Sequence, residues 1–240
     1  LIWRREKIFW IPEYRDLWSC GHGARVNSFQ RLVFPVVERW LLRSASAIVT
    51  VSEPLANVLR ELYRKNVVVV YNGYDADVEM KNGRPENQCN ENNDKPLRPC
   101  PENKLWISYL GSIYEGRDPE LLMQAIASSH QLKENICLTF YTDSSSSQVS
   151  HLASRLGIDE VVKVIPKVPY EMSLAVQRHS DVLLYLGYSS KTHPGDGILS
   201  GKAFEYLQSK NPILALNVNA SHPLVADKLI QPANSVSEIV

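Results

Sequence analysis

The stretch 197–207, with the sequence GILSGKAFEYL, carries groups that could hold a phosphorylated ligand. A helix is predicted to begin near Ser200, and a helix N-terminus presents free N–H groups and a positive dipole end, which suit a phosphate. Gly201 would let a ligand approach the backbone closely, and Lys202 adds a cation. The Glu205 carboxylate can accept two hydrogen bonds from a vicinal diol such as that of ribose. The same residues could equally form a capped helix with an acid near its start, so both interpretations stand.

The elements that would position these residues alternate between strand and helix over 105–240. The strands are near-continuous apolar runs, which is typical of a parallel sheet with helices on both faces. Ligands of such sheets bind beyond the carboxyl ends of the strands. The predicted strands are 105–110, 136–141, 161–165, 181–186 and 212–216. The predicted helices are one capped by Asp118 with Pro119 at its first position, and then 148–156, 170–178 and 200–208.

A shorter alternation precedes this region. The predicted strands are 7–12, 47–51 and 66–70, and the predicted helices are 29–43 and a helix from the N-cap Ser52 to about Arg64. Residues 81–104 then contain a single aliphatic residue, Leu97, and are predicted to form a mobile linker because they cannot bury enough apolar surface. The fold class is therefore α/β, with Rossmann-like parallel sheets.

Composition limits the possible partners. Lys and Arg together number 26, as do Asp and Glu, so no global field attracts nucleic acid. Residues 1–43 hold eight basic and four acidic residues, a local excess of +4, which indicates either a solvated surface or contact with an anionic membrane. The residues after Leu1 show no basic head with an apolar middle, so no leader is expected, and no apolar run approaches the roughly 18 residues of a membrane span.

The four cysteines, Cys20, Cys89, Cys100 and Cys137, have spacings that fit neither a zinc site nor a small disulfide framework. A reducing compartment is therefore expected. With the composition, this predicts a cytoplasmic protein, soluble or peripheral at a membrane. A dinucleotide dehydrogenase is disfavoured, because no GxGxxG follows a predicted strand.

Several short motifs occur in the order typical of one enzyme family. They are YRDLW at 14–18, SAIVTVSE at 46–53, YNGYD at 71–75, YLGSIYEGRDPE at 109–120, VPYE at 168–171 and GKAFEYLQSKNPILAL at 201–216. Together they resemble family 4 (group 1) retaining glycosyltransferases of the GT-B architecture, over nearly the whole chain except 81–104. The resemblance implies that 1–75 is a remnant of the N-terminal acceptor-side domain. It makes 76–104 a linker or insertion, and 105–240 a nucleotide-sugar donor-binding domain, incomplete at its end.

The resemblance also assigns roles to residues. Glu205 would hold the ribose hydroxyls, Gly111 would let the diphosphate lie close to the backbone, and Arg117 and Lys202 would neutralise the charge on the leaving group. Further donor contacts would come from Ser112, Tyr170, His193, Asp196, Ser200 and Gly201. Acceptor-side residues would be Arg15, Asp16 and His22, the last because imidazole titrates near neutrality.

Two positions depart from the family pattern. Gly197 stands where many members carry an acid, and Ser112 stands where many carry Arg after the loop glycine. The implied sugar contacts are therefore less well matched than the nucleotide contacts. His22 and His193 could also be ordinary loop histidines.

The implied reaction is transfer of a hexose-type sugar from a nucleoside diphosphate sugar to an acceptor, with retained configuration. The acceptor would be a saccharide, a lipid-linked sugar or a small molecule, and neither a cofactor nor a metal is expected. Two alternatives stay open: an epimerase or hydrolase of the same architecture, and a non-catalytic nucleotide-sugar-binding protein. The chain by itself is expected to be inactive as a transferase.

Overall fold

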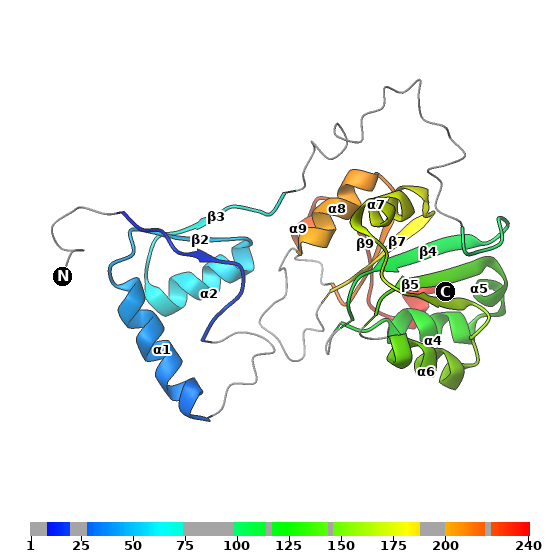
Figure 1. The fold of residues 1–240 in the computed structure, drawn as a ribbon, viewed down its shortest axis with the longest axis horizontal. Helices are drawn as coiled ribbons and strands as arrows, with labels where there is room; N and C mark the ends of the chain where they lie inside the picture. Colours follow the sequence, from blue (N-terminus) through cyan, green and yellow to red (C-terminus); the bar gives the residue numbers. More distant parts are fainter. Residues whose placement is uncertain are drawn as a thin grey trace, which may run out of the picture. The chain divides into compact units, whose positions relative to one another are not determined.

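The computed structural model describes residues 9–19, 28–73, 98–113, 117–143, 146–187, 200–218 and 222–240 (Figure 1). The chain divides into two compact units. One consists of Leu1–Asn72 with His193–Ser200, and the other of Gly73–Thr192 with Gly201–Val240. We call them the first unit and the second unit.

The first unit is built on a short parallel sheet with the strand order β1-β2-β3. Its elements are β1 (Glu13–Tyr14), α1 (Ser28–Leu42), β2 (Ile48–Thr50), α2 (Glu53–Tyr63) and β3 (Val67–Val69). The buried core combines residues from all three strand regions and α2, among them Leu17, Ile48, Leu55, Leu59 and Val67. This small core confirms the predicted βαβ alternation before residue 73.

The first strand differs from its prediction. The apolar run 7–12 predicts a strand, whereas β1 is Glu13–Tyr14, and residues 7 and 8 lie outside the described part of the chain. Pro12 provides the physical reason, because it has no N–H to donate to a ladder. Its carbonyl still accepts a hydrogen bond from Val49 N at 2.9 Å, so the chain enters the sheet there.

Helix α1 follows the predicted range closely and contains Pro35 within it. Its apolar side chains are largely exposed: Phe29, Leu32, Val36 and Trp40 have exposed fractions of 68–74%. Helix α1 therefore presents a continuous apolar face that no described residue covers.

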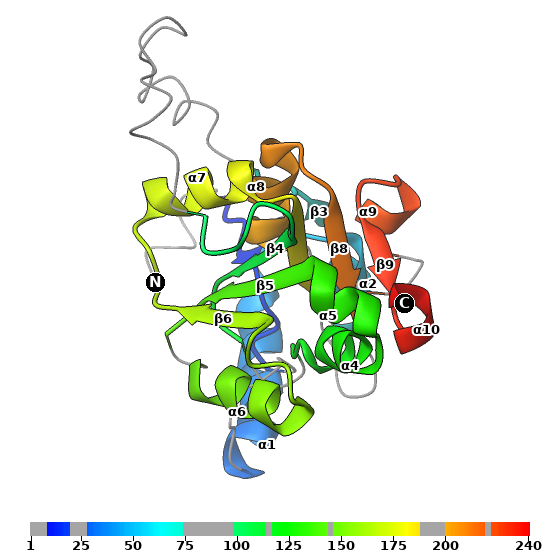
Figure 2. The ribbon, with the colours of Figure 1, turned by 90° about the vertical axis from the view of Figure 1, so that its right-hand side faces the viewer.

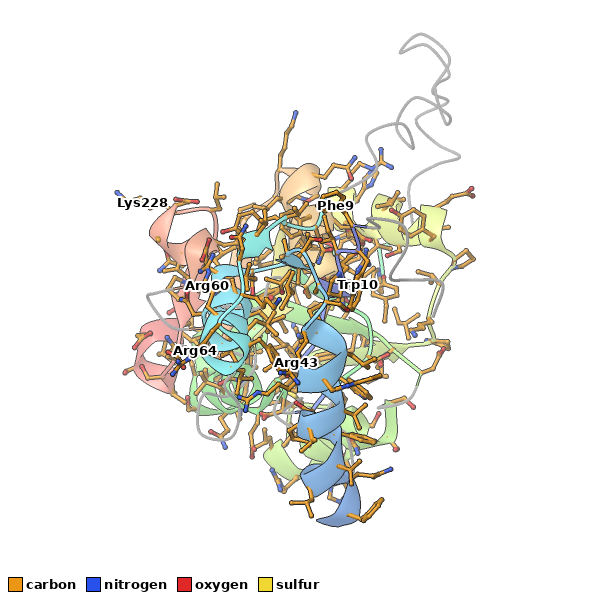
Figure 3. All side chains as sticks on the ribbon, turned by 90° about the vertical axis from the view of Figure 1, so that its left-hand side faces the viewer. Phe9, Trp10, Arg43, Arg60, Arg64 and Lys228 are labelled. Carbon is orange, nitrogen blue, oxygen red and sulfur yellow. A yellow bond between two sulfur atoms is a disulfide. The ribbon has the colours of Figure 1, made fainter. Side chains whose placement is uncertain are left out.

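Helix α2 has the N-terminus that its sequence predicts. Ser52 is the N-cap, and its hydroxyl accepts a hydrogen bond from Leu55 N at 3.4 Å. At the other end Arg64 adopts a left-handed conformation and closes the helix. Arg60, labelled with Arg64 in Figure 3, donates to the carbonyl of Val67 at 3.0 Å and pairs with Glu53 at 2.9 Å. The bond to Val67 holds α2 against β3, and the ion pair with Glu53 lies within α2.

The second unit is a six-stranded parallel sheet in the order β6-β5-β4-β7-β8-β9. Figure 2 shows α4 and α6 on one face and α7 and α8 on the other. Its elements are β4 (Leu105–Leu110), α4 (Glu120–Ser128), α5 (His130–Asn135), β5 (Ile136–Tyr141), α6 (Ser146–Leu156), β6 (Val162–Ile165), α7 (Tyr170–His179), β7 (Val182–Leu186), α8 (Gly201–Ser209), β8 (Ile213–Leu216), α9 (Pro223–Ala226), β9 (Gln231–Ala233) and α10 (Val236–Ile239). This strand order is that of a Rossmann fold, which confirms the predicted class.

Burial explains why the sequence predicts this unit well. Strand β5 is buried along its whole length and β4 along all but Leu105, as expected for strands covered on both faces. Helix α4 buries Leu122, Met123 and Ile126 completely. It begins at Glu120, not Pro119, yet Asp118 does accept a hydrogen bond from Glu120 N at 3.1 Å. The short elements α5, α9, β9 and α10 are absent from the sequence-based prediction.

The segment before β4 corrects two expectations. Residues 98–104 belong to the predicted linker, but they are fixed: Arg98 pairs with Asp181 at 2.8 Å and donates to the carbonyl of Lys104 at 2.6 Å. Cys100 and Cys137 form a disulfide, which the cysteine spacings and the expected reducing compartment do not predict. The part of the predicted linker before residue 98 lies outside the described residues.

Among the helices that the structure describes, none combines the length and the apolar character that crossing a bilayer requires.

Candidate functional site

The carboxyl ends of β4 and β7 mark the point where the chain order of the second unit reverses. Strand β4 lies between β5 and β7, and the chain leaves the sheet in opposite directions on its two sides. Such a switch point is where open parallel sheets bind ligands. Gly111 follows β4 here with φ +137°, a conformation that favours glycine, and its N–H donates to the carbonyl of Tyr141 at 3.0 Å.

Helix α8 brings a lysine directly over this glycine. A methyl group built on Gly111 would occupy the position of the Lys202 ammonium group. The Lys202 Nζ also lies 4.5 Å from the ring centroid of Tyr109, within the range of a cation–π contact. A side chain at residue 111 would therefore displace the flexible end of Lys202, and the backbone conformation at φ +137° is the stronger reason for glycine there.

The electrostatics around Lys202 are those of an anion site. Burial, and then the nearby Arg117 guanidinium, lower the pKa of Lys202 to about 8, and Lys167 acts in the same direction. Glu205 opposes the shift. The half-buried Lys202 and Arg117 and the exposed Lys167 repel one another, and an anionic ligand would relieve that repulsion.

Tyr206 fixes α8 to the end of β4. Its side chain is fully buried, and its hydroxyl accepts a hydrogen bond from Leu110 N at 3.1 Å. Burial raises the pKa of Tyr206 well above its ordinary value. Because Leu110 directly precedes Gly111, this bond sets where the N-terminal turn of α8 lies relative to the glycine.

Glu205 lies beside Tyr206 on α8 and faces α7. Its Oε2 accepts a hydrogen bond from Gln177 Nε2 at 3.5 Å, and its side chain is half-buried. The helix thus carries a cation in its first turn and a partly buried carboxylate in its second. That combination could hold a phosphate and a neighbouring diol.

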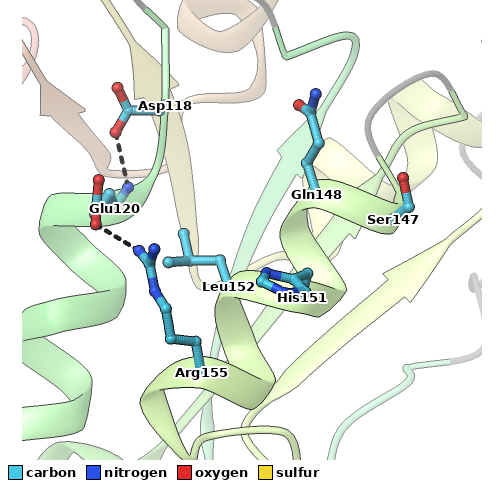
Figure 4. A pocket seen from close by; sticks show the side chains of 7 residues that line it. All are labelled: Asp118, Glu120, Ser147, Gln148, His151, Leu152 and Arg155. Carbon is cyan, nitrogen blue, oxygen red and sulfur yellow. Dashed lines mark hydrogen bonds and ion pairs between the residues drawn. The ribbon is translucent and has the colours of Figure 1, made fainter.

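A separate depression of about 520 Å³ lies between α4 and α6 (Figure 4). Its lining residues include Asp118, Ser147 and His151. Arg155, its only guanidinium among the lining residues, is already paired with Glu120 at 2.8 Å. None of the predicted site residues lines it.

Comparison with known proteins adds to this geometry. Residues 16–78 match the family model of Glycosyltransferase Family 4. WaaG, a glycosyltransferase involved in lipopolysaccharide biosynthesis, matches with 16% identity and a TM-score of 0.67 over 95% of this chain and 63% of its own. The fold is that of the GT-B glycosyltransferases. No curated protein matches the sequence.

Two further structures share the GT-B fold. A glycosyltransferase from Rickettsia africae has 16% identity and a TM-score of 0.63 over 95% of this chain and 58% of its own. Sucrose-phosphate synthase from Thermosynechococcus elongatus has 15% identity and a TM-score of 0.58 over 91% of this chain and 53% of its own. The chain thus spans less than two thirds of the length of these GT-B structures.

The second unit brings four of the predicted residues together: Gly111, Arg117, Lys202 and Glu205. Ser112 lies next to them, and its carbonyl accepts a hydrogen bond from the hydroxyl of Tyr109 at 2.7 Å.

The other residues predicted to contact the donor are only partly described. Tyr170 is the first residue of α7 and is half exposed. Gly201 begins α8, one residue after the predicted Ser200, and a Cβ there would meet nothing within 4 Å. His193 and Asp196 lie outside the described residues.

The predicted acceptor-side residues are in the first unit. Arg15 is exposed and pairs with Glu13 at 2.7 Å, and Asp16 is also exposed. His22 lies outside the described part of the chain. The structure therefore does not test a shared role for these three residues.

Three neighbours of the site are absent from the sequence-based prediction: Lys167, Gln177 and Tyr206. Tyr206 directly follows Glu205, and its place on the buried face of the helix could have marked it as an anchor. Nothing in the local pattern distinguishes Gln177 or Lys167, because their contacts come from other segments of the chain.

Proposed function

We propose that the second unit binds a nucleoside diphosphate sugar and serves an enzyme that transfers its hexose to an acceptor with retained configuration. The acceptor would be a saccharide, a lipid-linked sugar or a small molecule. The observation that carries the proposal is the Lys202 ammonium group over Gly111, beside Arg117, at the switch point of a GT-B sheet.

The charges fit a diphosphate. The charged form of the partly buried Lys202 is disfavoured in the free protein, and a ligand with two negative charges would stabilise it more than a ligand with one. Glu205, one turn further along α8, would accept hydrogen bonds from the ribose hydroxyls. HepE from Anabaena, crystallised with UDP and glucose, shares the fold with 13% identity and a TM-score of 0.56. A uridine nucleotide is therefore the first to test.

The proposed chemistry needs no covalent intermediate. The bond between the anomeric carbon and the diphosphate oxygen breaks while the acceptor oxygen bonds to that carbon on the same face. The acceptor proton passes to the departing phosphate. Arg117 and Lys202 would stabilise the charge that grows on the diphosphate during this step.

Binding measurements on the folded chain test the site. Lys202→Ala should weaken UDP and UDP-sugars by about 10- to 100-fold, or ~1–3 kcal/mol, and barely affect uridine, which lacks the phosphates. Glu205→Gln should weaken UDP and uridine alike by a similar factor, because each diol bond loses its charge assistance. Lys163→Ala and Glu160→Gln, exposed on the same unit, are the matched controls. Unchanged affinity in folded Lys202 and Glu205 variants would refute the site.

Product analysis separates transfer from its alternatives. An epimerase or hydrolase would consume the donor without an acceptor, and a binding protein would consume none. The anomeric configuration of the product, read by NMR with a longer enzyme that contains this chain, tests retention.

We also propose a peripheral membrane contact through the first unit. It is supported by the +4 excess within 1–43 and by the exposed apolar face of α1. Sedimentation with phosphatidylglycerol vesicles should exceed that with neutral vesicles, and salt should reduce it. Equal sedimentation with both vesicle types would contradict the proposal.

A further inference from the structure

Among the residues that the structure describes, Gln177 has a buried side-chain amide whose nitrogen is hydrogen-bonded and whose oxygen is not. It lies on α7 with an exposed fraction of 2%. Its Nε2 donates to Glu205 Oε2 at 3.5 Å and to Ser173 Oγ at 3.3 Å. Its Oε1 is buried and has no hydrogen-bond partner among the described residues.

The unpartnered oxygen shows what orients the amide. A buried acceptor without a partner costs roughly 1–3 kcal/mol, so such groups are rare. Turning the amide over would place Oε1 against the Glu205 carboxylate, where two acceptors repel. The observed orientation gives the carboxylate a donor and leaves the amide oxygen unsatisfied. The contacts with Ser173 and Glu205 together therefore favour this orientation of the amide.

The backbone beneath Gln177 is held at several points. Asn211 follows α8, and its Nδ2 donates to the carbonyls of Gln177, Arg178 and Ser180 at 2.7, 3.1 and 2.9 Å. One side chain thus ties the C-terminal end of α7 to the segment between α8 and β8. The Ser180 hydroxyl also donates to Ser108 Oγ on β4 at 2.8 Å. With its backbone held and its side chain buried, the amide of Gln177 stays close to Glu205.

We infer that Gln177 is a positioning residue, which holds the Glu205 carboxylate in the orientation that receives the ribose diol of the donor. This inference rests on the proposed function and extends it to a residue that does not itself need to touch the ligand. Without the amide, the half-buried carboxylate can rotate or take up a water, and part of its preorganisation for the diol is lost. The diphosphate contacts of Lys202 and Arg117 should be unaffected.

The test compares two ligands that differ only in the diol: UDP and 2′,3′-dideoxy-UDP. Gln177→Met keeps the length of the side chain and removes the donor. It should weaken UDP by about 5- to 10-fold and dideoxy-UDP by less than about 2-fold. Gln177→Glu keeps the shape but opposes Glu205 with a second carboxylate, and should weaken UDP further. A merely structural role would weaken both ligands equally.

The matched control is Gln124→Met. Gln124 Nε2 donates to Glu120 Oε1 at 3.2 Å on α4, which is the same amide-to-carboxylate contact on an exposed surface. This variant should bind both ligands as the wild type does. Thermal unfolding of each variant checks that it is folded.

The outcomes separate the inference from the proposed function. If Glu205→Gln removes the preference for UDP over dideoxy-UDP while both Gln177 variants keep it, only the role of Gln177 is wrong. If the wild type shows no such preference, the diol assignment of Glu205 fails and the inference fails with it. If Gln177→Met is folded and loses both ligands equally, Gln177 is structural and the inference is overturned.

Discussion

Helices α1 and α4 have similar sequence patterns and very different surroundings. Helix α4 of the second unit leaves Leu122, Met123 and Ile126 with no exposed surface. In the first unit, α1 exposes 74% of Leu32 and 68% of Trp40. An apolar stripe predicts which face of a helix is buried, but not whether anything within the same chain buries it.

The same contrast holds for the sheets. The second unit has strands of three to six residues in one six-stranded sheet, whereas the first unit has strands of two or three residues in a three-stranded sheet. Since stability grows with the apolar surface that a unit buries, most of the folding free energy should come from the second unit. Gly111, Arg117, Lys202 and Glu205 all belong to this better-packed unit, which suits a site that needs fixed geometry.

Separating the two units should produce the largest effect. A fragment of residues 98–240 should unfold cooperatively in urea, because its sheet is covered on both faces. A fragment of residues 9–73 should show no cooperative transition, since so small a core rarely offsets the loss of chain entropy. Far-UV circular dichroism during urea titration measures both. A sharp transition in the shorter fragment would contradict the contrast drawn above.

Breaking the disulfide should have the next largest effect, and only on the second unit. Cys100 and Cys137 are 37 residues apart, and closing a loop of that length stabilises a fold by about 3–4 kcal/mol in the chain-entropy model. Replacing both by Ser should lower the free energy of unfolding of 98–240 by that amount. Dithiothreitol should do the same to the wild type and nothing further to the variant. Two free thiols in the unfolded, non-reduced 98–240 fragment would show that the bond does not form.

The sequence predicts the second unit well because its signals are local. Buried parallel strands read as continuous apolar runs, so β4 and β5 are predicted with their observed bounds. Gly111, Lys202 and Glu205 are predicted from helix-terminus chemistry and a family resemblance, and the structure brings them close together. The first strand is misplaced because Pro12 affects hydrogen bonding without interrupting the apolar run.

Other features depend on contacts between distant segments. Tyr206 and Leu110 are 96 residues apart, and Gln177 and Glu205 are 28 apart. The disulfide likewise depends on the fold, which brings Cys100, in the segment before β4, next to Cys137 at the start of β5. The periodicity within a single helix or strand says nothing about contacts between residues so far apart in the sequence. The side-chain partners of the site could therefore not be predicted from the sequence.

Removing the buried cation should stabilise the second unit while weakening the donor site. The pKa of Lys202 is lowered to about 8, so the folded state disfavours its charged form. Between pH 8 and the ordinary lysine pKa the unfolded state binds more protons, and wild-type stability should rise with pH. Lys202→Met should therefore be more stable at pH 7 by on the order of 1–3 kcal/mol. That gain should shrink towards pH 10.

Urea titrations of 98–240 at pH 7 and pH 10 measure this difference. Lys163→Met, an exposed lysine on β6, is the control and should change little at either pH. A Lys202→Met variant that is less stable at pH 7 would mean that the contact with the Tyr109 ring outweighs the burial of the charge.

The smallest change in stability should come from α1, although that helix has the most conspicuous apolar surface. Leu32→Gln combined with Trp40→Gln should alter the free energy of unfolding of the whole chain by less than about 0.5 kcal/mol, because both side chains are already in water. Binding of a hydrophobic dye and vesicle sedimentation should both fall. Leu42→Gln on the same helix, 2% exposed, should instead cost about 2–4 kcal/mol through burial of an unpaired amide. If the double substitution lowers the free energy of unfolding as much as Leu42→Gln does, then the apolar face of α1 is covered in solution. Helices α1 and α4 would then both be covered and would differ only in what covers them.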